Sequence, residues 1–336
     1  MKIDRHLSWV LLRRGDEILM GLKKRGFGAG KLNGVGGKQE PNETIEECAI
    51  RETQEEIGVK ITKFECLGRI IFDNLFYKNV PECNMMHCFV ATEWEGEPTE
   101  SDEEAPQWIK IKDLDYSKLW GDDEYWLPPV LAGKEIEAYF HYNSDNTFDE
   151  YWVDEVPNKQ IGPIIDDELV GLGKKKVQKP KLKNFYGARA VLQNEKGQFA
   201  LIHATKRGWY KLPGGGHEAD ELWGENLRRE LIEETGFKVK DVTPLGYIIN
   251  IRADWNMHAI AYMYLCKTAE FVGKNQMDDE IEDGDQLEWF DSIDEAIAAL
   301  EAVDLKKIDF YGAYFFTRRE IEAFKCAKQV LQEKYE

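Results

Sequence analysis

The chain contains the same motif twice, and this repeat constrains its fold more than any other feature. The first copy, GGKQEPNETIEECAIRETQEEIGV, begins at Gly36, and the second, GGHEADELWGENLRRELIEETGF, begins at Gly215. The offset that aligns Arg51 with Arg229 also aligns identical residues at Gly37 and Gly215, Glu43 and Glu221, Glu52 and Glu230, Glu55 and Glu233, Glu56 and Glu234, and Gly58 and Gly236. Each copy opens with glycines, which permit unusual backbone angles, and ends at a Gly suited to cap a helix. Two domains of one fold are therefore predicted, each with a glycine loop followed by a helix.

Three glutamates in each copy share one face of the predicted helix. Glu52, Glu55 and Glu56 lie at positions i, i+3 and i+4, where like charges repel and make each other's ionisation harder. A solvated acidic helix would explain one such triplet. A hard divalent cation also removes the conflict, because carboxylates are its preferred ligands. The recurrence of the triplet with the same glycines favours the cation.

Composition bounds the classes of partner and compartment. At 336 residues, with 43% hydrophobic and 12% aromatic content, the chain is typical of a globular protein with two domains. The formal net charge of −19 argues against polymeric nucleic acid or an anionic membrane as a partner. The cysteines form no C-x-x-C pair, and neither a signal peptide nor a membrane-spanning run is found. We therefore expect a cytoplasmic protein with buried thiols; CNMMHCFV indicates a strand better than a zinc site.

Both halves show the same order of elements around the motif. HLSWVLLRRGDEILMGLKK predicts a β-hairpin around residues 14–16, and KNFYGARAVLQNEKGQFALIHATKRG predicts a second around 194–197. Between them, GLGKKKVQKPKLK carries lysines without an acid, which is typical of an exposed linker. We predict a first domain over residues 1–156, a linker over 157–180 and a second domain over 181–336, closed by the amphipathic helix TRREIEAFKCAKQVLQEKY.

Both copies resemble the Nudix box, G-x5-E-x7-R-E-U-x-E-E-x-G-U, in which U is a bulky apolar residue. The second copy fits at every position, and the first departs only at Thr53. The resemblance implies an α/β protein with two Nudix folds, each a mixed β-sheet sandwiched between helices. It also implies hydrolysis of a nucleoside diphosphate that is linked to a further group.

In this family the box holds the divalent cation, so the resemblance implies Mg²⁺, or Mn²⁺ in its place, as the cofactor. The implied metal ligands are Gly36, Gly37, Glu52, Glu55, Glu56, Glu230, Glu233 and Glu234, the glycines through a backbone carbonyl. The same glutamates are the candidate catalytic residues, and either Glu55 or Glu56 could take the proton from the attacking water.

Two further roles around the box are predicted. Arg51 and Glu43 are expected to pair across the loop and support the helix, as are Arg229 and Glu221 in the second half. A further catalytic acid after the first box is expected at Glu100.

The first half also resembles one branch of the family, the oxidised purine nucleoside triphosphate hydrolases, which act on 8-oxo-dGTP and 2-hydroxy-dATP. The resemblance covers about residues 7–156 and rests on GLKKRGFGAGKLNGVGGK before the box and LWGDDEYWLP after it. It implies a base-binding set made of Lys23, Phe27, Asn33, Phe72, Trp120, Asp122 and Asp123. Two adjacent carboxylates in apolar surroundings raise each other's pKa, so one can stay neutral and donate a hydrogen bond. An ordinary solvated turn is the alternative interpretation of the two aspartates.

The second half lacks this base-binding set. Lys211 occupies the register of Asn33, and Glu280 and Glu282 are equal candidates for a further acid, so the second substrate is open. One alternative function is a dinucleotide or nucleotide-sugar hydrolase; another is a second domain that binds or dimerises without turnover. Nucleoside triphosphates are the expected partners, polymeric nucleic acid and membranes are not, and the oligomeric state is open.

Overall fold

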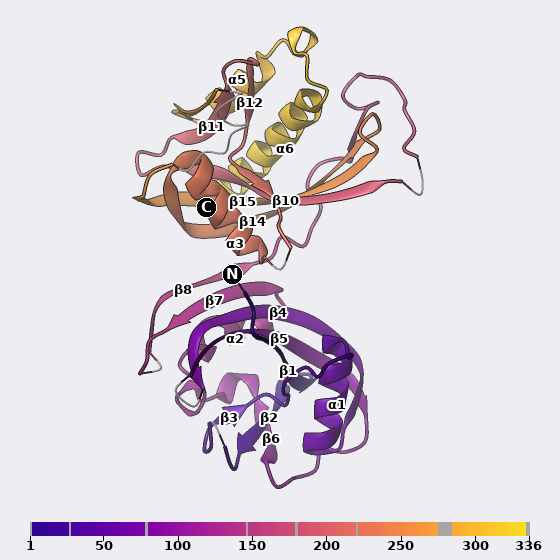
Figure 1. Cartoon of the computed structure of the whole chain (residues 1–336), viewed down its shortest axis with the longest axis vertical. Helices are drawn as coiled ribbons and strands as arrows, with labels where there is room; N and C mark the ends of the chain where they lie inside the picture. The colour runs from indigo at the N-terminus through magenta and orange to yellow at the C-terminus, as the bar shows by residue number, and fades with distance from the viewer. Residues whose placement is uncertain are drawn as a thin grey trace. The chain divides into compact units, whose positions relative to one another are not determined.

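The computed structural model divides into two compact units, residues 1–156 and 157–336, and each contains one mixed β-sheet (Figure 1). It describes residues 2–26, 28–77, 80–145, 147–178, 181–219, 221–274 and 284–333. Helices pack on both faces of each sheet, so the predicted α/β class is confirmed. In these ranges no helix is both long and apolar enough to cross a membrane.

The sheet of the first unit has the strand order β3-β2-β1-β5-β4-β7-β8, and β6 pairs with β2. Its strands are β1 (Arg5–Arg14), β2 (Glu17–Lys23), β3 (Leu32–Asn33), β4 (Lys60–Tyr77), β5 (Val80–Glu95), β6 (Glu104–Lys110), β7 (Ile136–Tyr142) and β8 (Phe148–Glu155). β1 pairs with β5 in parallel, as β4 does with β7, whereas the other pairs are antiparallel. β1 and β2 form the predicted hairpin, with Arg14 opposite Glu17.

Two α-helices cover the first sheet, α1 (Ile45–Ile57) and α2 (Asp123–Leu131). α1 begins at a capping box, in which the Thr44 hydroxyl accepts the N–H of Glu47 and the Glu47 carboxylate accepts the N–H of Thr44. It ends at Gly58, whose φ of 72° lies in the left-handed region that favours glycine. The ends of the box helix are therefore fixed by local sequence.

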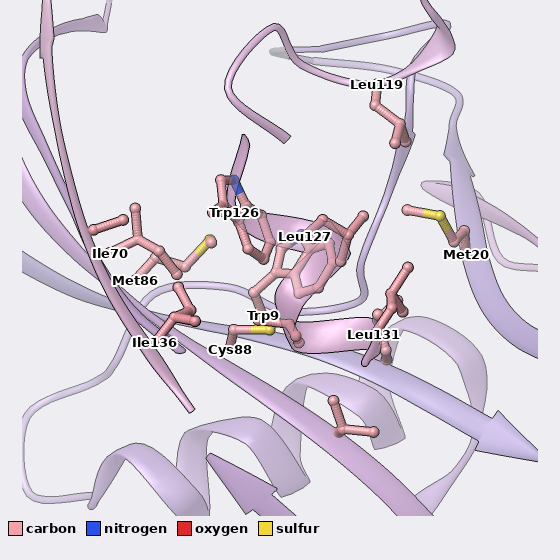
Figure 2. Close-up of a cluster of buried hydrophobic side chains, with 14 of the residues drawn as sticks. Trp9, Met20, Ile70, Met86, Cys88, Leu119, Trp126, Leu127, Leu131 and Ile136 are labelled. Carbon is pink, nitrogen blue, oxygen red and sulfur yellow. The ribbon is translucent and has the colours of Figure 1, made fainter. Parts of the chain in front are cut away.

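The core of the first unit lies on both faces of its sheet, because residues alternate along each strand. Trp9 and Trp126 meet edge to face under α2, with ring centroids 5.0 Å apart (Figure 2). The next residue, Val10, points to the other face and packs with Ala49 and Ile57 of α1. The sheet thus places the box helix on one face and α2 on the other.

The second unit has the strand order β12-β11-β10-β15-β14-β9, with β13 on β10 and β16 on β11. Its strands are β9 (Ile165–Asp166), β10 (Lys183–Gln193), β11 (Phe199–Ala204), β12 (Trp209–Lys211), β13 (Gly214–Gly216), β14 (Phe237–Arg252), β15 (Met257–Phe271) and β16 (Asp285–Phe290). Its helices are α3 (Trp223–Thr235), α5 (Ile293–Glu301) and α6 (Gly312–Glu333), and short 3-10 helices span Ile111–Asp113, Tyr116–Lys118 and Leu305–Lys307. The hairpin between β10 and β11 and the final helix agree with the sequence.

The segment 157–172 belongs to the second unit, whereas an exposed linker was expected over 157–180. Ile161 and Ile165 are buried in the core of the second unit. β9 pairs in parallel with β14, as β7 pairs in parallel with β4 in the first unit. The second sheet therefore recruits a strand from before its first hairpin, and residues 173–178 of this stretch contain no buried side chain.

Candidate active site

One arginine holds the first box together. Arg51 on α1 donates to Glu43 Oε1 (2.8 Å), to Glu52 Oε1 (2.7 Å) and to the carbonyl of Lys38 (3.1 Å). Its guanidinium lowers the pKa of Glu43 to about 2. The contact predicted between Arg51 and Glu43 is present, and it joins the loop to the helix.

The second box repeats this arrangement. Arg229 on α3 donates to Glu221 Oε1 (2.8 Å), to Glu230 Oε1 (2.9 Å) and to the carbonyl of Gly216 (3.1 Å). The two boxes therefore share one loop–helix frame.

The glycines of each loop let the box carboxylates approach the backbone. A Cβ at Gly37 would overlap the carboxylate of Glu52, so a larger residue would displace it. The N–H of Gly36 donates to Glu56 Oε2 (3.0 Å), and the carbonyl of Gly37 accepts the N–H of Ser8 on β1 (2.9 Å). In the second unit, a Cβ at Gly215 would likewise overlap the carboxylate of Glu230. The N–H of Gly214 donates to Glu234 Oε2 (2.6 Å).

A buried acid that the sequence did not single out, Glu104 on β6, accompanies the first box. Burial raises the pKa of Glu56 to about 7, and the charge of Glu104 contributes. Burial likewise raises the pKa of Glu104 to about 7, against the attraction of Lys23, whose Nζ lies 3.8 Å from Glu104 Oε1. A buried carboxylate, Glu104, and a half-buried one, Glu56, thus compete for one lysine.

Glu100 is not placed with the box, which corrects the prediction of the further acid. Its side chain is 65% exposed and pairs with Lys24. β6 begins at Glu104, and alternation places Glu104 on the same face as Trp108, which packs beneath α1. That alternation was the available signal, but four acids within residues 100–104 obscured it.

The donor set of the first unit fits a divalent cation. No three or more His, Cys, Asp or Glu side chains in the described ranges form a ready-made metal cage. However, Glu104 Oε2 is buried and has no hydrogen-bond partner among the described residues. A buried carboxylate oxygen without a partner, near the half-buried carboxylate of Glu56, is the kind of charge excess that a hard cation relieves.

The raised pKa values of Glu56 and Glu104 predict that stability falls as pH rises when no divalent cation is bound. Each carboxyl binds its proton more tightly in the folded chain, with a pKa of about 7, than in the unfolded chain, near 4.5. This contribution is fully present below 4.5 and is lost as pH rises through 7. Thermal unfolding of the full chain in EDTA should show the fall between pH 5 and 8, and Glu104→Gln should flatten it. Glu97→Gln, which removes a carboxylate from an exposed position of the same unit, is the control; equal slopes for both variants would contradict the assignment.

Two adjacent aspartates at the start of α2 are buried with different partners. Asp122 is 4% exposed and accepts from Trp126 Nε1 (3.0 Å) and Tyr142 Oη (2.7 Å). Asp123 is 3% exposed and accepts the backbone N–H of Trp120 (2.9 Å). Burial raises the pKa of both carboxyls, and the charge of Asp122 raises that of Asp123 further. Asp123 is therefore the carboxyl that retains a proton, and a solvated turn does not describe this pair.

Asn33 is linked to the aspartates through two tryptophans. Its Oδ1 accepts from Trp9 Nε1 (2.8 Å), and Trp9 packs against Trp126, which donates to Asp122. The sequence alone does not indicate a place for Trp9 in the base-binding set, because an aromatic residue in a buried strand is ordinarily part of the core.

The remaining residues of the predicted base-binding set have different environments. Trp120 packs against the backbone at Gly28, where a Cβ would come within 2.7 Å of its ring. Phe72 is buried and stacks on Phe140, with centroids 6.1 Å apart. Phe27 lies outside the described residues. Trp120 thus lies beside the glycine-rich loop, whereas Phe72 is mainly a core residue.

Strand pairing places Lys211 where the first unit has Asn33. In the second unit, Ile202 on β11 lies between Lys211 on β12 and Leu287 on β16. In the first unit, Gly21 on β2 lies in the same way between Asn33 on β3 and Pro106 on β6. By the same register, Asp285 at the start of β16 corresponds to Glu104 at the start of β6. Glu280 and Glu282 lie outside the described residues.

Comparisons with known proteins match both units. The family model described as NUDIX domain matches residues 4–129 and 183–311. The N-terminal region is similar to an oxidized purine nucleoside triphosphate hydrolase of Danio rerio, with 41% identity over 150 residues, 45% of this chain and 94% of that protein. A NAD-capped RNA hydrolase NudC of Pseudomonas putida is 33% identical over 132 residues, which are 39% of this chain and 40% of that protein. A solved MutT protein from Bacillus halodurans is 27% identical, with a TM-score of 0.40, and the match covers 45% of this chain and 97% of that chain.

Proposed function

The chain belongs to the Nudix family of hydrolases, and we propose that its first unit hydrolyses oxidised purine nucleoside triphosphates such as 8-oxo-dGTP and 2-hydroxy-dATP. The products are the nucleoside monophosphate and pyrophosphate, so the role is sanitation of the nucleotide pool. The observation that carries the proposal is the buried pair of Asp122 and Asp123. The likeness to the Danio rerio hydrolase supports it.

The two aspartates offer a donor and an acceptor side by side. Asp122 receives two hydrogen bonds, from Trp126 and Tyr142, which favour its ionised, accepting form. Asp123 is buried beside that charge, which favours its neutral, donating form. The edges of oxidised purines present both donors and acceptors, so this pair can read 8-oxoguanine as well as 2-hydroxyadenine. Trp120 would stack on the base.

The box carboxylates supply the phosphate end of the site. Mg²⁺ or Mn²⁺ would be held by the glutamates of the box together with a carbonyl of the glycine turn, and we add Glu104 to that set. A cation bound there supplies neutralisation of the triphosphate and a lower pKa of the attacking water. Arg51 keeps Glu52 in position through its direct bond. Either Glu55 or Glu56 would take the proton of the attacking water.

A dinucleotide or nucleotide sugar is the second candidate substrate, most of all for the second unit. The likeness to NudC, described as a NAD-capped RNA hydrolase, favours a dinucleotide-type linkage. The net charge of −19 disfavours a long RNA. The second unit has Lys211 where the first has Asn33, so we expect 8-oxo-dGTP to be a poor substrate there. A second unit that binds without turnover is the remaining alternative.

The test is a nucleotide panel with pyrophosphate detection on the full chain in Mg²⁺. We expect kcat/KM for 8-oxo-dGTP to exceed that for dGTP by about 100-fold, because a site that hydrogen-bonds a substrate edge rejects the analogue that lacks it. NAD and ADP-ribose in the same panel, read by release of monophosphate, test the second candidate. Equal kcat/KM for 8-oxo-dGTP and dGTP would remove the substrate assignment and leave the reaction class intact.

A further inference from the structure

A lysine in the second unit lies between the two carboxylates that correspond to Glu56 and Glu104. Lys211 Nζ is 3.0 Å from Glu234 Oε1 and 2.8 Å from Asp285 Oδ2. The side chains of Glu234 and Asp285 are only 4% and 3% exposed. One ammonium group therefore bridges two buried acidic side chains at hydrogen-bond distance.

Among the described residues of the first unit, no lysine bridges Glu56 and Glu104 at hydrogen-bond distance. Lys23, its nearest counterpart, comes from β2, and its Nζ stays 3.8 Å from Glu104. The N–H of Gly36 donates to Glu56, as the N–H of Gly214 does to Glu234, so this bond is common to both units. The position that Lys211 takes on β12 is filled in the first unit by Asn33, which is neutral and bonds Trp9. The corresponding pair of acids thus has a lysine 3.8 Å from one carboxylate in the first unit and a lysine at 2.8–3.0 Å from both carboxylates in the second.

Lys211 stays charged in this position. A lysine side chain is ordinarily protonated at neutral pH, and the carboxylates of Glu234 and Asp285 at hydrogen-bond distance favour the charged form. A divalent cation that entered between the same oxygens would meet the ammonium at about 3 Å, where like charges in a poorly solvated space repel strongly.

A second cation lies near the same box. In the strand register, Arg189 on β10 lies opposite Met263 on β15, and Trp9 on β1 lies opposite Cys88 on β5. Arg189 therefore occupies in the second unit the position that Trp9 occupies in the first. Its positive charge interacts with Glu234 and Glu230. Where the first unit has the neutral side chains of Trp9 and Asn33, the second unit therefore has two cations.

We propose that Lys211 is a built-in counter-ion that lies between Glu234 and Asp285. In the first unit, a divalent cation takes the corresponding place between Glu56 and Glu104. The second box, although intact in sequence, then binds free divalent cations at least about tenfold more weakly than the first. This revises the expected role of Glu234 as a metal ligand. The inference rests on the proposed metal site of the first unit.

The chemistry of the second site changes accordingly. A fixed ammonium donates hydrogen bonds and cannot accept them, so Lys211 suits a phosphate or another anionic group of a substrate. The first unit presents Asn33 at this position, which can donate to and accept from a base. The substrate class that fits the second unit is therefore one recognised through an additional anionic group near the box.

The test is a count of tightly bound Mn²⁺ ions per full chain, by electron paramagnetic resonance of the free ion, without any substrate. Wild type should bind one tight ion, and Glu56→Gln should lose it. Lys211→Asn, which installs the residue of the first unit, should gain a second ion, and Lys211→Asn/Glu234→Gln should lose that gain. Lys307→Asn, the same change at a side chain 83% exposed, should keep the wild-type count.

The outcomes separate this inference from the proposed metal site. An unchanged count in Glu56→Gln would remove the first-unit site. The role of Lys211 would be overturned if the wild-type chain bound two tight ions. One of the two would then persist in Glu56→Gln and disappear in Glu56→Gln/Glu234→Gln. That comparison does not depend on how well the Lys211 variant folds. A folded Lys211→Asn chain, checked by circular dichroism, that still binds one ion would overturn the role as well.

Discussion

Replacing Glu56 with Gln is expected to lower kcat for 8-oxo-dGTP by about 100- to 1,000-fold, the loss typical of removing one electrostatic contact to the transition state. Gln keeps the shape of the side chain and can still accept the N–H of Gly36. The change therefore removes charge and leaves the loop in place. Steady-state pyrophosphate release by the full chain in Mg²⁺ measures it.

Glu46→Gln is the matched control for this substitution. Glu46 lies in the first turn of α1 and is exposed, so its loss removes the same charge from the same helix. We expect its kcat to stay within about twofold of wild type, since surface substitutions have small effects. Near-normal turnover of Glu56→Gln would refute the assignment of Glu56 to the phosphate end of the site.

The frame of the box could be predicted from sequence because its contacts are local. Arg51 and Glu43 are eight positions apart, and α1 is fixed by the capping box at Thr44 and by Gly58. Such contacts depend on the spacing of residues along one helix and one loop. The repeat shows the same spacing in both halves of the chain. The same logic predicted the register of Lys211 from that of Asn33.

The parts that could not be predicted depend on pairing between distant strands. Glu104 reaches the box because β6 pairs with β2, and a shift of one residue would have placed Glu103 there instead. The contact between Lys211 and Asp285 joins β12 and β16 through β11, which lies between them. The place of Lys211 was predictable, but its ion pairs were not. The segment with Ile161 and Ile165 was misassigned because two buried residues among polar ones give no periodic pattern.

The proton on Asp123 gives the most specific prediction for the base-binding residues. The pKa of Asp123 is raised well above its ordinary value by burial and by the charge of Asp122. The neutral, donating form therefore exists below that raised pKa and is lost as pH rises through it. An amide donates at every pH, so Asp123→Asn should retain most of kcat/KM for 8-oxo-dGTP and should lack the decline at high pH that wild type shows. The amide oxygen can still accept the N–H of Trp120.

Asp123→Ala has neither donor nor acceptor, and its kcat/KM should fall by about 10- to 100-fold, the effect of one buried hydrogen bond with an unpaired partner. The measurement is kcat/KM for 8-oxo-dGTP from pH 6 to 9 in the full chain. Asp113→Asn, at an exposed position, controls for the loss of a carboxylate and should reproduce the wild-type profile. If Asp123→Asn lost as much as Asp123→Ala, the ionised carboxylate would be the form that reads the base. The donor role would then pass to Asp122, which already accepts two hydrogen bonds and is less suited to hold a proton.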